Sequence, residues 1–221
     1  MKKLLITIDG PAGAGKTTVS RALAERLGYR YIDTGALYRG VAYEVSRRGI
    51  DPQNDHELRG LCRRLQLRFV TNEKGLRLYS GKTDISDSIR TPEISMLASA
   101  VSAKSVVREY LLEVQRHMGR QKAAVFEGRD MGTVVFPDAD VKFFLNASPE
   151  IRALRRFRES DAESGQSLKE IQKDMRRRDI NDSTRRLAPL RPADDAIRID
   201  SSELPVEQVV DLMLAHVEQG R

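Results

Sequence analysis

Eight consecutive residues near the start of the chain have the spacing of a phosphate-binding loop. Gly10-Pro11-Ala12-Gly13-Ala14-Gly15-Lys16-Thr17 fits the pattern G-x-x-x-x-G-K-[ST]. The glycines let backbone N–H groups turn toward phosphate oxygens, and a helix that begins near Lys16 would add the positive end of its dipole. Lys16 can reach the β- and γ-phosphates, and the Thr17 hydroxyl can bind Mg²⁺. The pattern therefore predicts a nucleoside triphosphate site.

This loop identifies the phosphate donor and leaves three classes of protein open: a GTPase-like switch, a motor or nucleic-acid ATPase, and a small-molecule kinase. A GTPase should carry an Asn-Lys-x-Asp string that reads the base, and the sequence contains none. A motor or helicase usually needs a longer chain and further ATPase motifs. A small-molecule kinase needs a second anion site and a lid, and the sequence contains candidates for both.

Two further segments carry arginines at the ends of expected strands. Asp33-Thr34-Gly35-Ala36-Leu37-Tyr38-Arg39 follows the second expected strand, and Glu127-Gly128-Arg129-Asp130-Met131-Gly132 follows a later one. Ligands of open α/β sheets bind at the carboxyl ends of the strands, so we expect Arg39 and Arg129 to be neighbours in one crevice beside the phosphate loop. Glu127 is placed to bind Mg²⁺ through a water molecule, or to pair with a nearby arginine.

A basic segment between residues 152 and 191 contains ten arginines and two lysines against seven acids. Arg178, Asp182 and Arg185 lie at i, i+4 and i+7 on one face of an expected helix, which Ser167–Glu170 begins with a capping box. Arg152, Arg155 and Arg156 form a stripe on a helix that Ser148-Pro149-Glu150 begins, and the polar stretch 160–167 joins the two. A solvated, salt-bridged face is the plainer interpretation. Beside a phosphate loop, we favour a mobile lid that brings positive charge over the transferring phosphates.

Short apolar strands that alternate with helical patterns carry these segments. Five strands are expected, at residues 4–8, 29–32, 123–126, 141–145 and 196–199. Helices are expected after the phosphate loop as far as Gly28, over about 36–48, and from about Pro205 onward. This alternation predicts an α/β fold in which helices flank both faces of a five-stranded parallel sheet.

One region breaks the alternation. Residues 67–70, 75–79 and 83–86 are expected to form an antiparallel meander with turns at 72–75 and 81–82. After the meander, Thr91-Pro92-Glu93 begins one helix and a second carries Val107, Leu111, Val114 and Met118. We therefore predict an inserted subdomain over about 51–90.

Composition excludes several classes of protein. The chain has 221 residues and a formal net charge of +6, and Cys62 is its one cysteine, so a disulfide framework and a cysteine-rich zinc site are excluded. Apolar runs are shorter than a membrane span or a signal peptide needs, which predicts a soluble cytoplasmic protein. Aromatic residues make up only 5% of the chain and it has no tryptophan, which disfavours the alternative of an NTP-dependent nucleic-acid-binding module.

The motifs in their order resemble those of bacterial cytidylate kinases, in the nucleoside monophosphate kinase group. The matching segments are Asp9–Thr18, Asp33–Arg39, Ile89–Thr91, Glu127–Asp138 and Ala188–Leu190, and the resemblance covers essentially the whole chain. It implies a P-loop NTPase fold with a nucleoside monophosphate (NMP)-binding insertion at about 51–90 and an arginine-rich helical lid at about 151–187. The core would comprise about 1–50, 91–150 and 188–221.

The resemblance implies transfer of the ATP γ-phosphate to CMP or dCMP with Mg²⁺ as cofactor. The ATP ligands would be the phosphate loop, Gly10, Pro11, Ala12, Gly13, Ala14, Gly15, Lys16, Thr17 and Thr18, with Arg155 and Arg156 of the lid. Another P-loop small-molecule kinase, acting on UMP or a similar acceptor, stays open as the alternative. The expected partners are small molecules, with no nucleic acid and no membrane, and a monomer is the expected state.

The resemblance also assigns residues of this sequence, position by position, to the binding of the acceptor nucleotide. Arg39, Arg129 and Arg178 would bind its phosphate, with Thr34 and Tyr38 at the same site.

The base and the sugar would be read by a second set. Ser99, Arg108 and Asp130 would contact cytosine, and Asp182 and Arg185 would contact the sugar. Catalysis would consist of positioning and charge neutralisation by Lys16, the arginines and Mg²⁺, because a phosphate oxygen is already anionic and needs no general base.

Overall fold

The computed structural model describes residues 3–73, 75–159 and 166–219. It divides the chain into two compact units, one made of residues 1–33 with 119–221 and the other of residues 34–118. Part of the polar stretch expected at 160–167 and one residue of the turn expected at 72–75 lie outside the described residues. In the described ranges, no helix combines the length and the apolar character that a bilayer crossing requires.

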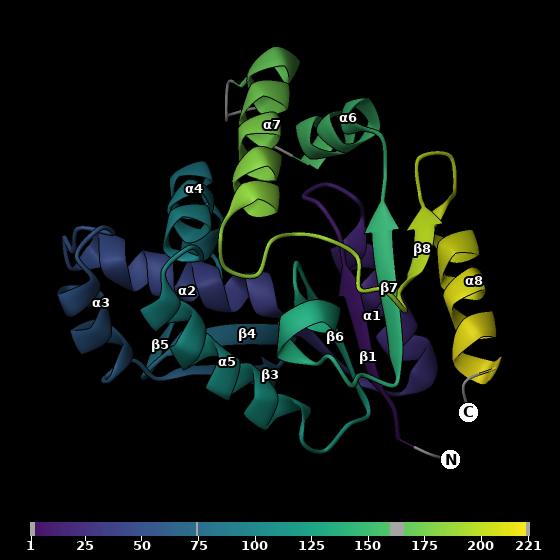
Figure 1. Cartoon of the computed structure of the whole chain (residues 1–221), viewed down its shortest axis with the longest axis horizontal. Helices are drawn as coiled ribbons and strands as arrows, with labels where there is room; N and C mark the ends of the chain where they lie inside the picture. Colours follow the sequence, from purple (N-terminus) through teal and green to yellow (C-terminus); the bar gives the residue numbers. More distant parts are fainter. Residues whose placement is uncertain (1–2, 74, 160–165, 220–221) are drawn as a thin grey trace. The chain divides into compact units, whose positions relative to one another are not determined.

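The first unit contains a five-stranded sheet in the order β2-β6-β1-β7-β8. The strands are β1 (Leu5–Asp9), β2 (Arg30–Asp33), β6 (Ala124–Gly128), β7 (Val141–Asn146) and β8 (Ile197–Asp200) (Figure 1). Every neighbouring pair is parallel. All five residues of β1 and of β6 are buried, which explains their continuous apolar pattern. The predicted parallel sheet is confirmed.

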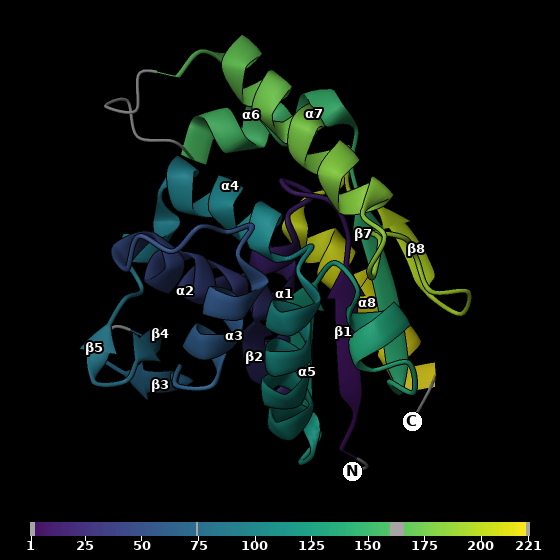
Figure 2. The same cartoon turned by 60° about the vertical axis from the view of Figure 1, so that its left-hand side comes forward.

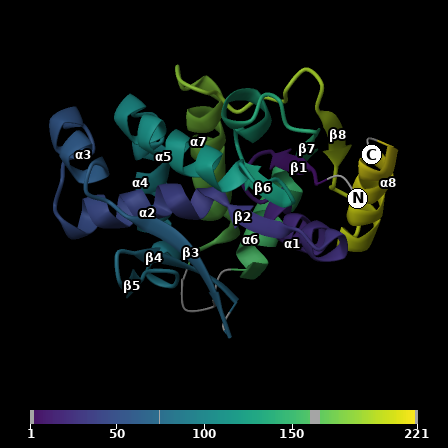
Figure 3. The same ribbon diagram turned by 90° about the horizontal axis from the view of Figure 1, so that it is seen from below.

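Helices α1 (Lys16–Leu27) and α8 (Val206–Gln219) cover one face of this sheet. Val19 and Leu23 of α1, Val209 and Met213 of α8, and Ile6 of β1 belong to one buried cluster. Figure 3 shows α1 and α8 on the same side of the strands.

A short π-helical turn, η2 (Met131–Val135), lies on the other face of the sheet. Phe136, directly after this turn, packs its ring 4.6 Å from that of Phe126 in β6. The side chains of Phe126 and of β1 residue Thr7 point away from the α1 side, as the alternation along a strand requires.

Two helices, α6 (Pro149–Glu159) and α7 (Leu168–Thr184), follow β7 and cross in contact with each other (Figure 2). The capping box predicted at the start of α7 is present, since Ser167 Oγ accepts from the Glu170 backbone N–H and the Glu170 carboxylate accepts from the Ser167 N–H. A salt bridge of 2.7 Å between Arg152 and Asp179 joins the two helices.

The second unit has its own core. It comprises α2 (Thr34–Arg47), α3 (Asp55–Cys62), β3 (Leu67–Asn72), β4 (Gly75–Ser80), β5 (Thr83–Asp84), the 3₁₀ turn η1 (Ser88–Arg90), α4 (Pro92–Val101) and α5 (Ser105–Gly119, whose last residue belongs to the first unit). The strands form an antiparallel sheet in the order β3-β4-β5. Leu37, Leu58, Leu78 and Leu111 are fully buried in the core of this unit. Thr91 caps α4, with Pro92 at the first helical position, as predicted.

Two details of this unit differ from the sequence prediction. The third strand of the meander ends at Asp84 instead of Ser86, because the Ser86 side chain turns back to bond the backbone of Leu78 and the carboxylate of Asp84. Helix α3 was not predicted. Asn54 caps it and Leu58, Leu61 and Cys62 face the core, but eight residues are too few for a clear helical period.

The phosphate loop has the strand–loop–helix context that its pattern predicts, because it runs from the end of β1 into the first turn of α1. Gly10 has a φ of 151° and Gly15 a φ of 84°, both values that favour glycine. A Cβ atom at Gly10 would overlap the backbone carbonyl oxygen of Leu145 in β7. The sheet therefore approaches the loop too closely for any other residue at position 10.

Replacing Gly10 with alanine should lower the free energy of unfolding by roughly 2–4 kcal/mol, because neither backbone segment can move away cheaply. The urea midpoint of Gly10→Ala measures this loss. Gly60→Ala is the matched control, since a Cβ on this exposed residue of α3 would meet no atom within 4 Å. Alanine there should stabilise the helix by about 0.5–1 kcal/mol. Equal midpoints for the two variants would contradict the close approach at Gly10.

Candidate active site

The backbone carbonyls of the phosphate loop are bonded by two side chains from elsewhere in the first unit. Arg152 of α6 donates from Nη1 to the Ala12 carbonyl at 3.1 Å, and Ser201, which follows β8, lies with its Oγ 3.0 Å from the Ala14 carbonyl. Arg152 also donates to the Ala147 carbonyl at 3.0 Å. These bonds occupy the carbonyls of Ala12 and Ala14, and the N–H groups of the loop are the donors that a phosphate would use.

Lys16, the first residue of α1, is 7% exposed. Its Nζ donates to the Pro11 carbonyl at 2.6 Å. Burial lowers the pKa of Lys16 well below its usual range, and the positive charges of Arg129 and Arg178 lower it further. The negative charges of Glu127 and Asp9 offset part of this fall. Three cations are thus crowded around the phosphate loop, an arrangement that a polyanionic ligand would relieve.

Arg129 and Arg178 share one buried carboxylate. Asp182 accepts from Arg129 Nε at 3.1 Å, and the Nε of Arg178, one turn earlier on α7, lies 4.0 Å from the same oxygen. Asp182 is 4% exposed. The structure therefore brings Lys16, Arg129, Arg178 and Asp182 together within the first unit.

A second ion pair joins the same two segments. Arg185, which follows α7, lies with its Nη2 3.3 Å from Asp130 Oδ1, and both side chains are buried. Arg185 Nε donates to the Ala188 carbonyl at 2.7 Å, so the guanidinium is bonded on two sides. The pairs Arg129–Asp182 and Asp130–Arg185 connect the turn after β6 to the end of α7.

Three of the predicted acceptor residues in the second unit also lie together. Arg108 of α5 stacks over the ring of Tyr38 in α2, with its Cζ 5.8 Å from the ring centroid. Arg108 donates to the Ser102 carbonyl at 3.3 Å, and Ser102 Oγ donates to the Ser99 carbonyl at 2.8 Å. Thr34, which begins α2, is 1% exposed.

Arg39 lies on α2, one residue after Tyr38. The expected proximity of Arg39 and Arg129, which belong to different units, stays a prediction.

The two lid arginines proposed for ATP differ in their surroundings. Arg155 donates to the Ser201 carbonyl at 2.5 Å and to Ser201 Oγ at 3.1 Å, and a Cβ at Gly15 would lie 3.6 Å from its Nη1. Arg156 is half exposed and lies 3.7 Å from Glu159. Arg155 is therefore beside the phosphate loop, whereas Arg156 pairs along its own helix.

Sequence reasoning missed three residues that shape this site. Asp9, the last residue of β1, accepts from the N–H groups of Met131 and Gly132 at 2.9 and 2.8 Å. Its position at the end of a fully buried strand was a usable signal, because a charge there needs partners. Arg152 was expected only as one arginine of a helical stripe, and its bond to the phosphate loop was not predicted. Ser201 had no signal, since its bonds depend on how β8 approaches the loop.

Comparison with known proteins identifies the family of this chain. A family model described as cytidylate kinase matches residues 6–219. A cytidylate kinase of Geobacter sulfurreducens is 53% identical over 217 residues, which cover 98% of this chain and 93% of that protein. One from Halalkalibacterium halodurans is 40% identical over 221 residues, which cover 99% of each. The chain belongs to the cytidylate kinase family.

Solved structures support the fold of the family. The shikimate kinase of Acinetobacter baumannii is 16% identical, with a TM-score of 0.51 over 100% of this chain and 96% of that one. A gluconokinase of Sinorhizobium meliloti is 15% identical, with a TM-score of 0.51 over 98% of this chain and 93% of that one. At these identities the likeness concerns the P-loop kinase fold alone.

Two oxygen atoms beside the phosphate loop suit the Mg²⁺ that is typical of kinases. Thr17 Oγ1 donates to Glu127 Oε1 at 2.9 Å, which brings a hydroxyl and a carboxylate to one point. Burial raises the pKa of Glu127, and the neighbouring carboxylate of Asp33 adds to the rise. A cation at this point would offset both effects, so the donor set fits a hard divalent ion.

The contrast between Arg155 and Arg156 gives a test. Arg155→Ala should raise the KM for ATP about tenfold, because the charge-assisted bond expected between Arg155 and an ATP phosphate would be lost. Arg156→Ala, on the same helix, should change this KM less than twofold. Steady-state kinetics with ATP varied measure both values. An equal effect of the two substitutions would show that proximity to Gly15 in the structure does not decide the ATP contact.

Proposed function

We propose that this member of the cytidylate kinase family transfers the γ-phosphate of ATP to CMP or dCMP, giving ADP and CDP or dCDP. The observation that carries the proposal is the gathering of Lys16, Arg129 and Arg178 around the phosphate loop within one unit. Such a group of cations matches the charge of two phosphorylated substrates. Membership of the family supports the choice of a cytidine nucleotide as the acceptor.

The proposed chemistry is positioning and charge neutralisation. The attacking atom is a phosphate oxygen of CMP, which is anionic near neutral pH, so no side chain has to remove a proton. Lys16 would bind the β- and γ-phosphates of ATP, and Arg129 and Arg178, with Arg39, would bind the phosphate of CMP. Their fixed positive charges lower the repulsion between the two nucleotides and stabilise the charge of the transferring group.

We propose that Thr17 and Glu127 bind Mg²⁺, with Glu127 acting through a water molecule. When bound, the ion would neutralise charge on the ATP phosphates and orient them. The 2.9 Å bond between the two side chains supports this assignment, because it fixes the directions of both oxygen donors.

Helices α6 and α7 are proposed to be the lid, and about 51–90 the NMP-binding insertion. The support for the lid is contact with the phosphate loop, since a Cβ at Gly13 would lie 2.8 Å from the Arg152 carbonyl of α6 and 2.8 Å from Met175 of α7. Closure of these helices would exclude water that could otherwise hydrolyse ATP.

The choice of base has an electrostatic account. Asp130 would accept from the N4 amino group of cytosine, and Arg108 would donate to its carbonyl or ring nitrogen, with Ser99 nearby. Uracil presents a carbonyl in place of the amine and would set its lone pairs against the Asp130 carboxylate. Asp182 and Arg185 would contact the sugar, and Thr34 and Tyr38 would lie beside the phosphate.

We further propose a monomer that acts in the cytoplasm. Among the described residues, the exposed large apolar side chains are Phe157, Ile180 and Leu212, which lie on three different helices. The lone cysteine, Cys62, suits a reducing compartment.

A panel of acceptors in a coupled assay of ADP release tests the proposed function. CMP and dCMP should be phosphorylated, with kcat/KM for CMP exceeding that for UMP by roughly 5–150-fold, the equivalent of one unpaired buried polar group at about 1–3 kcal/mol. AMP and shikimate should be poor acceptors. Equal use of UMP and CMP would overturn the role of Asp130 and favour a kinase of another acceptor.

The proposed binding of the acceptor phosphate by Arg178 can be tested with the adjacent Arg177 as a control. Arg178→Ala should lower kcat/KM for CMP by roughly 10²–10³-fold, because the transferring charge loses one fixed donor. Arg177→Ala removes an exposed arginine of the same helix that pairs with Asp174 at 3.3 Å, and it should change kcat/KM less than twofold. Full turnover by the Arg178→Ala enzyme would exclude Arg178 from the acceptor site.

A further inference from the structure

Asp9 occupies an unusual position for a carboxylate. It is the last residue of β1, directly before the phosphate loop, and is 3% exposed. Its two oxygens accept from two consecutive backbone amides, Met131 N at 2.9 Å and Gly132 N at 2.8 Å. A buried charge at the end of a central strand is costly unless it is bonded in this way, so these two bonds account for its tolerance in the fold.

The two amides belong to the turn that follows Arg129 and Asp130. Met131 and Gly132 begin η2, where the first N–H groups have no carbonyl partner within the turn. A Cβ at Gly132 would lie 3.1 Å from Thr7 Oγ1 and 3.2 Å from Lys142 Cδ, so the turn packs directly on β1 and β7. Asp9 therefore attaches the start of η2 to the strand that leads into the phosphate loop.

We propose that Asp9 is a positioning residue, which sets Arg129 and Asp130 at a fixed place relative to the phosphate loop through its bonds to Met131 and Gly132. This inference rests on the proposed function, in which Arg129 binds the acceptor phosphate and Asp130 reads the base. Asp9 itself contacts neither nucleotide in this scheme. Its effect is to align acceptor with donor, and misplacement by about 1 Å can lower a rate about 10²-fold.

The phosphate loop has bonds that do not involve Asp9. Arg152 bonds the Ala12 carbonyl and Ser201 approaches the Ala14 carbonyl. The turn at Met131 and Gly132, by contrast, has its first two amides bonded to Asp9. Loss of the carboxylate should therefore disturb the acceptor residues more than the ATP-binding loop. A general loss of stability would affect both to the same extent.

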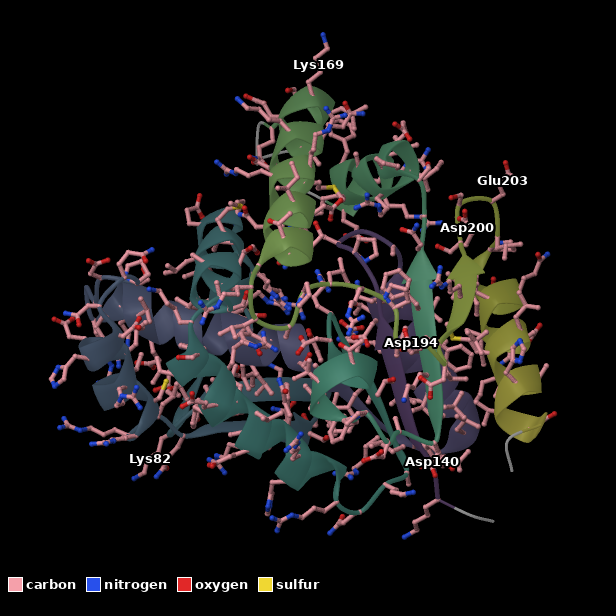
Figure 4. All side chains as sticks on the ribbon, viewed as in Figure 1. Lys82, Asp140, Lys169, Asp194, Asp200 and Glu203 are labelled. Atoms are coloured by element: carbon pink, nitrogen blue, oxygen red, sulfur yellow. The ribbon has the colours of Figure 1, made fainter. Side chains whose placement is uncertain are left out.

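Asp140 supplies a matched control. It is a carboxylate at the start of β7 that accepts from the Leu5 backbone N–H of β1 at 2.8 Å and pairs with Lys122 at 2.8 Å. Figure 4 shows Asp140 at the end of the sheet away from α6 and α7. Asp140→Asn thus removes a carboxylate–amide bond at the start of β1, the strand that ends with Asp9.

The experiment compares Asp9→Asn with Asp140→Asn and the wild-type enzyme. Asparagine has nearly the same shape as aspartate, but one of its two oxygens is replaced by an NH₂ group. That group cannot accept a hydrogen bond from a backbone N–H, so one of the two bonds is lost. In Asp9→Asn, kcat/KM for the acceptor that the wild-type enzyme uses should fall at least tenfold, while the Kd for ATP from calorimetry stays within threefold. Asp140→Asn should change both quantities less than twofold, although it lowers the thermal midpoint.

Hydrogen exchange supplies a readout that does not depend on the acceptor. The amides of Met131 and Gly132 should exchange at least tenfold faster in Asp9→Asn, while those of residues 12–16 keep their protection. If the wild-type enzyme phosphorylates no cytidine nucleotide, the proposed function is wrong. The exchange rates of Met131 and Gly132 would still show whether Asp9 protects these amides. Should Asp9→Asn not fold, Asp9→Glu, which displaces the carboxylate by one methylene, should give the same kinetic split.

Two results would overturn the inference. One is wild-type kinetics with the acceptor in a folded Asp9 variant. The other is an equal loss of ATP and acceptor affinity, or an equal loss in Asp140→Asn, which would make Asp9 a contributor to stability alone.

Discussion

The central constraint on this protein is repulsion between like charges. Lys16, Arg129 and Arg178 are close enough that the two arginines lower the pKa of the lysine, in a place from which water is largely excluded. Like charges that are held together in a poorly solvated place repel one another. A fold that keeps these cations together in the absence of nucleotides must supply opposing charge. Binding of phosphates would then relieve the remaining repulsion between the cations.

Carboxylates from different parts of the first unit supply the opposing charge. Asp182 on α7 faces Arg129 and Arg178, and Asp130 faces Arg185. The charges of Glu127 and Asp9 raise the pKa of Lys16. The two ion pairs join the turn after β6 to the end of α7, so binding of a phosphate to Arg129 must compete with Asp182. The site is therefore organised by its acids as much as by its arginines, and a movement of α7 would alter both pairs.

Much of this could be predicted from the sequence, and the omissions have physical reasons. The five strands, the phosphate loop and the capping box at Ser167 depend on local patterns of burial and turn chemistry, which a sequence displays directly. The bonds of Asp9 and Ser201 depend on which strands are neighbours, information that periodicity does not contain. Helix α3 was missed because eight residues give a weak period, and the surroundings of Arg155 and Arg156 differ although their sequence context is the same.

The charge state of Lys16 can be measured directly. An NMR titration of its side-chain ammonium, assigned with a Lys16→Arg variant, would give the pKa in the free protein and in the complex with ATP and Mg²⁺. The account predicts a pKa well below the ordinary value of about 10.4 in the free protein and a rise when ATP binds. A pKa that is ordinary in the free protein and unchanged by ATP would contradict the crowding of cations on which the account depends.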